Sequence, residues 1–457
     1  MTPLRHHIRA TLFLGLPLIG SQVAQILITL TDTIMIGWYG VPELAAVALG
    51  GSFFHTVLIV GMGFALAVTP LVAAAAAQED KVQVRRVTRM GLWIALLFSA
   101  LAMPLFLFAQ PILLALGQEE LVSENTQSYL AIAGWAIWPS LMFLVLRSHL
   151  SALEHTRVVL LATLAAVALN AGLNYLLIFG NFGLPEMGLR GAATAAIISN
   201  MLIFVILALY ATRKIGLAEY TLFARFWRPD WEAFAQVFRL GWPIALTLLA
   251  ESALFMASML MMGWVDELTL AAHGIALQIT ALTFMVHVGL STAATVRAGR
   301  AWGLQDFVSL RLAAIAALIL SGIMVAVTMV VFLTLPAPLV SVFVGPDDPL
   351  RDQIIAIGVG LLMVSAVFQL ADAAQVMALG LLRGVQDTRV PMIIATISYW
   401  LIGIPCSYVF GFTLGWGGQG IWAGLVIGLV VAGVFMMMRF WSRAARLSDA
   451  QPENSAA

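Results

Sequence analysis

Charged residues and cysteine are scarce in this chain, and each shortage excludes a class of protein. Only 10% of its 457 residues are charged, whereas soluble domains carry about 25%. With 61% hydrophobic residues and a mean hydropathy of +0.98, the chain cannot build a water-exposed surface. The single cysteine, Cys406, excludes a disulfide framework and a thiolate metal site. The composition therefore predicts a polytopic membrane protein.

Several enzyme signatures are also missing. The sequence contains no HExxH, no GxSxG and no P-loop GxxxxGK[ST], so metalloprotease, serine hydrolase and ATP-driven chemistry lack support. We expect no enzyme and no organic cofactor, and we keep a membrane-embedded enzyme or a channel as alternatives of other classes. The formal net charge is zero and says nothing about partners, and we expect no nucleic-acid partner.

Long apolar runs fill most of the chain. A membrane-spanning helix needs about 20 apolar residues, and such continuous runs favour helices over the ~10-residue alternation of a barrel. The runs predict an all-α membrane protein with twelve transmembrane helices, which lie at about 12–36, 44–76, 87–109, 127–151, 158–179, 190–211, 238–264, 268–296, 309–335, 353–382, 390–413 and 419–441.

Charge alternates between successive connections. If both termini are cytoplasmic, all but Arg190 and Arg351 of the 23 Lys and Arg residues fall on or near the cytoplasmic side. Basic residues prefer cytoplasmic loops, so this asymmetry predicts a multi-pass protein of the cytoplasmic (inner) membrane with both ends inside.

The two halves of the sequence resemble each other. LGLP (14–17) matches LGWP (240–243), and EHTRV (154–158) matches QDTRV (386–390). The repeat predicts two pseudo-symmetric six-helix lobes around a central site, a common transporter plan. We expect an N-lobe at 1–211, a cytoplasmic connector at 212–237, a C-lobe at 238–441 and a cytoplasmic tail at 442–457.

Three acidic residues, Glu251, Asp372 and Asp32, fall inside apolar spans. Carboxylates in a membrane must be paired, protonated or hydrated, and we expect no Lys or Arg at comparable depth to pair with them. Carboxylate oxygens also suit a small hard cation. These acids therefore predict a coupling site for H⁺ or Na⁺, with Glu251 and Asp372 as metal ligands if the ion is Na⁺.

Polar residues accompany these acids at helical spacing, which places each set on one face. Asn170 and Asn174 are candidates for a polar cavity, although interhelical hydrogen bonding is an equal alternative. Gln25 and Gln278 are assigned to the same cavity. Gln25 holds the position in the first half that Glu251 holds in the second. The acids are therefore not duplicated with the scaffold, and this asymmetry favours a function that each molecule performs at one site only. Pro17 is a candidate hinge, with a static kink as the alternative.

The segments TDTIMIG (31–37), LNAGLNYLLIFG (169–180), LAES (249–252), LADAAQ (370–375) and RGVQDTRVP (383–391) resemble the MATE (multidrug and toxic compound extrusion) family, NorM-like branch. The resemblance implies the MATE fold. It also implies a secondary active antiporter that exports organic, often cationic, xenobiotics in exchange for Na⁺ or H⁺ by alternating access.

Carried over to this sequence, the resemblance assigns Asp32, Asn170 and Asn174 to an N-lobe polar site. It assigns Glu251 and Asp372 to a C-lobe cation site, with the aromatic positions Phe255 and Phe284 beside it. Some relatives carry a tyrosine one turn before the second C-lobe acid, where this chain has Phe368. Because Phe368 lacks the hydroxyl of that tyrosine, the sequence does not decide between Na⁺ and H⁺ as the coupling ion.

Substrate class and partners follow from the same resemblance. We expect small organic substrates, a membrane-lipid environment and a monomer. A superfamily-related exporter of lipid-linked or saccharide substrates is the alternative, and it would show extra spans and a strongly cationic cavity.

Overall fold

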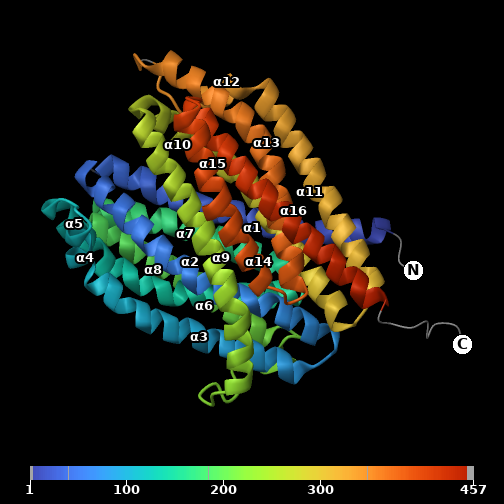
Figure 1. The fold of residues 1–457 in the computed structure, drawn as a ribbon. Helices are drawn as coiled ribbons and strands as arrows, with labels where there is room; N and C mark the ends of the chain where they lie inside the picture. The colour runs from blue at the N-terminus through green and yellow to red at the C-terminus, as the bar shows by residue number, and fades with distance from the viewer. Residues whose placement is uncertain (1–3, 40, 184, 347, 450–457) are drawn as a thin grey trace, which may run out of the picture. The chain divides into compact units, whose positions relative to one another are not determined.

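The computed structural model describes residues 4–39, 41–183, 185–346 and 348–449, without the side chains of 41–45 and 446–449. The described residues form helices and no strand (Figure 1). The first half contains α1 (Leu4–Tyr39), α2 (Val41–Ala77), α3 (Lys81–Leu107), α4 (Ala109–Ala115), α5 (Glu120–Ala133), η1 (Gly134–Ala136), α6 (Ile137–Ala152), α7 (Thr156–Phe179), η2 (Asn181–Gly183) and α8 (Leu189–Arg213).

The second half begins with a short turn of the connector and continues to the end of the described chain. Its elements are η3 (Ala218–Tyr220), α9 (Trp231–Val265), α10 (Glu267–Gly303), α11 (Phe307–Thr334), α12 (Pro336–Ser341), α13 (Arg351–Gly384), α14 (Arg389–Thr396), η4 (Ile397–Gly403), α15 (Ile404–Tyr408), η5 (Val409–Thr413) and α16 (Gly417–Asp449).

Within the described residues, 12 helical segments are long and apolar enough to cross a membrane, which confirms the expected all-α class and number of spans. Two of these spans are composite. The fourth joins α5, η1 and α6, and the eleventh joins α14, η4, α15 and η5. The helices extend beyond the apolar runs because backbone hydrogen bonding continues into polar residues, so α1 begins at Leu4 and α16 continues to Asp449. Residues 450–457 of the expected tail lie outside the described residues.

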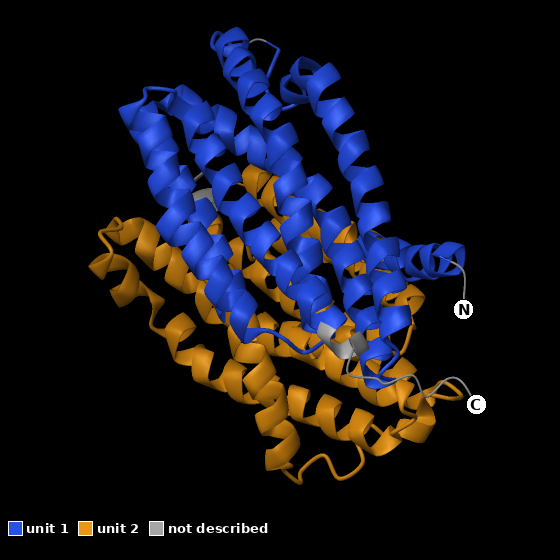
Figure 2. Ribbon diagram, turned by 45° about the vertical axis from the view of Figure 1, so that its right-hand side comes forward, with its two compact units in different colours: residues 1–19, 246–457 blue, residues 20–245 orange. Residues whose placement is uncertain are grey.

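The chain divides into two compact units (Figure 2). Unit 1 comprises residues 1–19 and 246–457, and unit 2 comprises residues 20–245. The boundaries fall inside α1 and α9, whereas the expected lobes of the sequence are separated by the connector. Each unit therefore contains the first part of the helix that continues into the other unit.

Close backbone contacts explain why each helix is divided there. In unit 2, a Cβ atom on Gly63 of α2 would lie 2.4 Å from the backbone nitrogen of Ala245 in α9. In unit 1, a Cβ atom on Gly289 of α10 would lie 2.8 Å from the backbone of Ile19 in α1. Only glycine permits these approaches, which fix the first part of each helix to its unit.

The two contacts are related by the sequence repeat. Gly289 and Gly63 are 226 residues apart (289 − 63), as are Ala245 and Ile19 (245 − 19). The same spacing (243 − 17) relates the helix-internal prolines Pro243 and Pro17, each two residues before a unit boundary. The duplicated sequence thus encodes a reciprocal exchange of helix segments.

The expected connector is an ordered part of unit 2. The Asp230 carboxylate accepts hydrogen bonds from Arg86 of α3 at 2.5 and 3.1 Å, and Trp93 of α3 donates to the Phe226 carbonyl at 2.8 Å. The Arg86 guanidinium holds the pKa of Asp230 below its ordinary value. These contacts attach the connector and the start of α9 to α3.

Packing within each unit positions the helices that carry the intramembrane acids. In unit 1, α13 packs against α10, α11 and α16, so its Asp372 face is covered from several sides. In unit 2, α7 packs along α8 and presents Asn170 and Asn174 as fully buried residues.

Candidate functional site

Unit 2 contains a compact polar cluster between α1 and α7. The Asn174 amide donates to Asp32 Oδ1 at 2.5 Å and to Asn170 Oδ1 at 3.3 Å. Asn170 and Asn174 are 0% exposed, and their spacing of four residues places them on one face of α7. The sequence prediction that these three residues share a site is consistent with this geometry. The neutral Asn174 amide stabilises the Asp32 carboxylate by hydrogen bonding and needs no positively charged side chain to do so.

The remaining residues of the α1 polar face have different environments. Gln25 is partly buried, and its Oε1 accepts no hydrogen bond from any described residue. Gln22 accepts a hydrogen bond from the Arg147 guanidinium of α6 at 2.6 Å. The sequence does not predict this contact, because an arginine side chain reaches several ångströms from its own backbone.

Unit 1 contains the other two acids. Glu251 of α9 is 8% exposed and Asp372 of α13 is 2% exposed. Glu251 Oε1 and Asp372 Oδ1 are buried and accept no hydrogen bond from the described residues. The two carboxylates lie close enough for their charges to interact. Two like charges in a buried site favour uptake of a proton or a cation, since both cannot remain ionised without compensation.

An arginine lies nearer to this pair than the sequence indicated. Arg383, in the last turn of α13, interacts electrostatically with Glu251. This interaction was not expected from the sequence, whereas the expectation about the depth of basic residues stays a prediction. Arg383 was assigned to a loop because the apolar run ends there, whereas α13 continues through it to Gly384.

Aromatic rings border the acid pair. Phe255 forms an edge contact with Phe368 at a centroid distance of 6.1 Å, and Phe368 forms another with Trp422 at 5.1 Å. Phe284 of α10 is partly buried, whereas Gln278 of the same helix is exposed. The fully buried Phe368 supplies no hydroxyl to the acids, and Trp422 was not expected from the sequence.

No group of three or more His, Cys, Asp or Glu residues that could hold a metal ion occurs within the described part of the chain. A Na⁺ site would therefore combine the two carboxylates with neutral oxygen donors, as hard cations accept. Gln375 Oε1 and Gln369 Oε1 on α13 are buried and without a hydrogen-bond donor among the described residues, so neutral oxygens are present on the same helix.

Comparison with known proteins identifies the family. The family model MatE matches residues 17–176 and 243–409, which include both clusters. The chain belongs to the MatE family. It is 46% identical over 444 residues to the probable multidrug resistance protein NorM of Rhizobium meliloti, covering 97% of this chain and 95% of the relative. The corresponding protein of Agrobacterium fabrum is 43% identical over 434 residues, covering 95% and 93%.

Solved structures of MATE proteins share the fold of this MatE-family chain. A MATE in complex with MaL6 superimposes with a TM-score of 0.89 at 20% identity, covering 97% of each chain. A MATE in the straight conformation gives 0.87 at 21% identity, also over 97% of each chain. The family and fold together establish a transporter of small organic compounds, a multi-pass membrane protein and not an enzyme.

Proposed function

We propose that this MatE-family protein is a secondary antiporter that exports organic, often cationic, compounds across the cytoplasmic membrane in exchange for H⁺ or Na⁺. Both termini are cytoplasmic in this proposal, and the protein acts as a monomer surrounded by lipid. The multidrug resistance relatives support the substrate class. The pair of buried carboxylates on α9 and α13 carries the proposal of ion coupling.

The acid pair can couple ion movement to substrate export because its total charge changes each time it binds or releases a proton or a cation. With both acids ionised, the buried pair repels itself and attracts a cation or a proton. With one proton or Na⁺ bound, the repulsion is relieved and the favoured conformation of the unit changes, because an ion shifts an equilibrium by its differential affinity. In this scheme, the helix-internal Pro17 and Pro243 allow α1 and α9 to bend between the two units.

The direct test uses the full-length protein in proteoliposomes. A pH gradient and a Na⁺ gradient are imposed separately, and uptake of a fluorescent organic cation is followed. We expect one of the two gradients to drive uptake, and the protein with Glu251→Gln to lose that response at equal insertion. Uptake that neither gradient stimulates would contradict antiport.

A matched control separates loss of coupling from loss of folding. Glu267, at the start of α10, lies outside both acid clusters and is exposed. Glu267→Gln removes the same charge from the same unit and should leave gradient-driven uptake at the wild-type rate.

A further inference from the structure

The eleventh span contains an unusual backbone feature next to the acid pair. It is π-helical in two places, η4 (Ile397–Gly403) in its middle and η5 (Val409–Thr413) at its end. Such turns account for well under 1% of residues in proteins and occur frequently at functional sites. The repeat-related span in unit 2, α7, is an uninterrupted α-helix from Thr156 to Phe179. The π-helical turns are therefore specific to the unit that carries Glu251 and Asp372.

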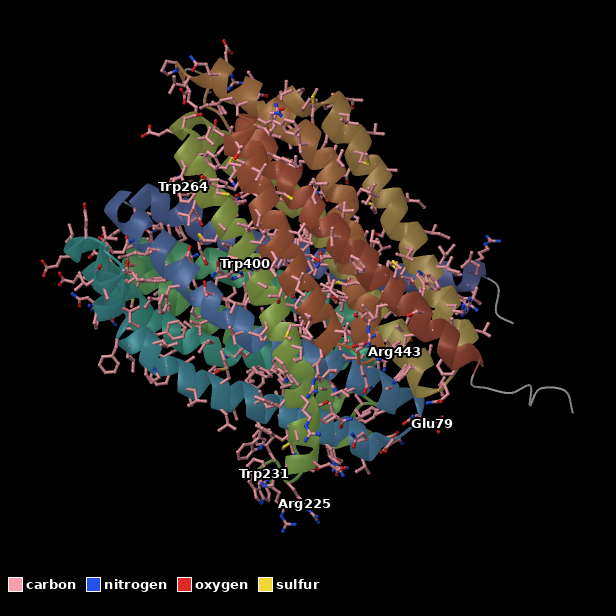
Figure 3. All side chains as sticks on the ribbon, in the orientation of Figure 1. Glu79, Arg225, Trp231, Trp264, Trp400 and Arg443 are labelled. Atoms are coloured by element: carbon pink, nitrogen blue, oxygen red, sulfur yellow. The ribbon has the colours of Figure 1, made fainter. Side chains whose placement is uncertain are left out.

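Side chains of η4 reach both acid-bearing helices. The Trp400 indole donates to the carbonyl of Ala250, the residue before Glu251, at 3.3 Å, and Trp400 lies beside α9 (Figure 3). The neighbouring Tyr399 hydroxyl accepts a hydrogen bond of 2.7 Å from the Gln375 amide, three residues after Asp372. Consecutive residues thus connect η4 to α9 and to α13.

Tyr399 is 0% exposed. A phenol has one donor and also accepts, and here the Gln375 amide occupies an acceptor position. Within the described residues, the Tyr399 hydroxyl donates to no hydrogen-bond partner given by the structure, while Glu251 Oε1 and Asp372 Oδ1 lack donors. Tyr399 interacts electrostatically with Glu251, Asp372 and Arg383.

We propose that Tyr399 is a third member of the unit 1 ion-coupling site, a positioning residue whose hydroxyl donates to the ionised Glu251–Asp372 pair while Gln375 fixes its orientation. The proposal rests on the antiport function proposed above and adds a residue that the sequence motifs do not include. Because Phe368 offers no hydroxyl, Tyr399 supplies the phenol of this site from a different helix.

The chemistry follows from what each group can exchange. An ionised carboxylate only accepts hydrogen bonds, so it pairs well with the phenol proton. When the carboxylate takes up a proton or a cation, its acceptor capacity falls and the bond to Tyr399 weakens. Tyr399 is then held by the Gln375 amide of α13 alone, while Trp400 keeps its bond to the Ala250 carbonyl of α9. In this way η4 responds to the charge state of the acids.

Other titratable groups on the packed helices have separate partners or positions. Helix α10, which packs against α13, carries His273, which accepts a hydrogen bond from Trp422 at 3.0 Å, and His287, which shares one with Ser321 at 3.0 Å. Helix α16 carries Arg439 and Arg443, which both bind Asp387 at 2.9 and 2.8 Å. Helix α14 carries Arg389 at its first residue, and α15 contributes only Cys406 and Tyr408 as titratable groups. The charged groups that act on Tyr399 are therefore Glu251 of α9 and Asp372 and Arg383 of α13.

The test measures protonation of the acids without requiring transport. A hydrophobic carbodiimide modifies protonated carboxyl groups, and mass spectrometry of the full-length protein measures modification of Glu251 and Asp372 across a pH series. Loss of the Tyr399 hydroxyl removes a hydrogen-bond donor that stabilises the ionised carboxylates, so the acids should keep their protons to a higher pH. We therefore expect Tyr399→Phe to move the labelling midpoint of Glu251 or Asp372 upward by about one pH unit.

Tyr408→Phe is the matched control, because Tyr408 is 52% exposed and lies in the next helical segment. It should keep the wild-type midpoint. If Tyr399→Phe does not fold, Gln375→Leu retains the phenol without its amide donor and should give a smaller upward shift. A wild-type midpoint in whichever variant folds would overturn the role of Tyr399.

The same experiment separates this inference from the proposed function. If Glu251 and Asp372 label with a pH midpoint in the wild type but Tyr399→Phe changes nothing, only the role of Tyr399 fails. If neither acid labels at any pH while gradient-driven uptake is absent, both the antiport function and the inference are refuted.

Discussion

The two units carry the same scaffold, but the acids within their membrane spans have different partners. In unit 2, Asp32 accepts a short hydrogen bond from Asn174, whose amide also reaches Asn170. In unit 1, Glu251 and Asp372 interact with each other, and each has an oxygen without a donor among the described residues. An amide donor offsets part of the cost of taking an ionised carboxylate out of water, whereas the unit 1 pair combines two like charges with oxygens that lack donors, which favours uptake of a proton or a cation. We infer that unit 1 performs the ion exchange and that unit 2 contributes polarity.

The sharpest way to break this comparison is to neutralise the acids of unit 1. Glu251→Gln and Asp372→Asn should each abolish gradient-driven uptake of an organic cation, because a single remaining carboxylate lacks the like-charge repulsion that drives uptake of the coupling ion. The measurement is uptake in proteoliposomes at matched protein insertion. Wild-type uptake by either variant would remove the ion-exchange role from unit 1.

The equivalent change in unit 2 should have a smaller effect. Asp32→Asn places an amide opposite the Asn174 amide and loses a charge-assisted hydrogen bond, which contributes about 1.5–3 kcal/mol. We expect a reduction of uptake of about 10-fold rather than complete loss. Exchange of the two groups in the double variant Asp32→Asn, Asn174→Asp restores one carboxylate and one amide donor, and it should recover part of the rate. Complete loss in Asp32→Asn would make the two units equivalent.

Because the two units share one scaffold, equivalent substitutions at its close helix contacts should destabilise both units equally. Gly63→Ala and Gly289→Ala each place a methyl group against the backbone of the exchanged helix segment. Such overpacking typically costs about 1–3 kcal/mol. Both variants should lower the melting temperature of the purified protein by several degrees and by similar amounts. A large loss in only one unit would show that the exchange is not energetically symmetric.

The controls for this pair come from the same two helices. A Cβ atom on Gly51 of α2 or on Gly274 of α10 would meet nothing within 4 Å. Gly51→Ala and Gly274→Ala should therefore leave the melting temperature unchanged or raise it slightly, because alanine is the better helix former.

The smallest expected effect concerns the connector, which belongs only to unit 2. Arg86→Gln removes the donor to Asp230 and should increase amide hydrogen exchange in residues 214–230 at pH 7, with a loss of about 1 kcal/mol of local stability. The lowered pKa of Asp230 means that its contribution is present above the ordinary carboxyl pKa near 4. It is lost as the pH falls through the lower pKa of the folded state.

Wild-type exchange in the connector, corrected for intrinsic rates, should thus approach that of the variant only under strongly acidic conditions. Lys81→Gln is the control, because Lys81 and its partner Glu219 have side chains 56% and 58% exposed. Exposed ion pairs contribute little, so exchange should be unchanged in that variant. A connector that exchanges freely in the wild type at pH 7 would contradict its ordered packing on α3.

Much of the fold could be predicted because its causes are local. The length of each apolar run predicted the twelve spans, since a bilayer requires about 20 apolar residues per helix. Helical spacing brought Asn170 and Asn174 to one face of α7, and the hydrogen bond to Asp32 agrees with that prediction. The repeat was visible in LGLP and LGWP, although it did not reveal that the segments containing them are exchanged between units.

The sequence by itself determined the membrane class, the twelve spans, the duplicated plan and the three acids within the spans, because composition and helical periodicity act over short distances. The tertiary structure alone decided which helix covers each polar face, as with the Tyr399 hydroxyl of η4 against the Gln375 amide of α13. Periodicity specifies a face of a helix but not its partner. A π-helical turn also rotates the following side chains away from the 3.6-residue pattern, so the position of Tyr399 could not be extrapolated from the sequence.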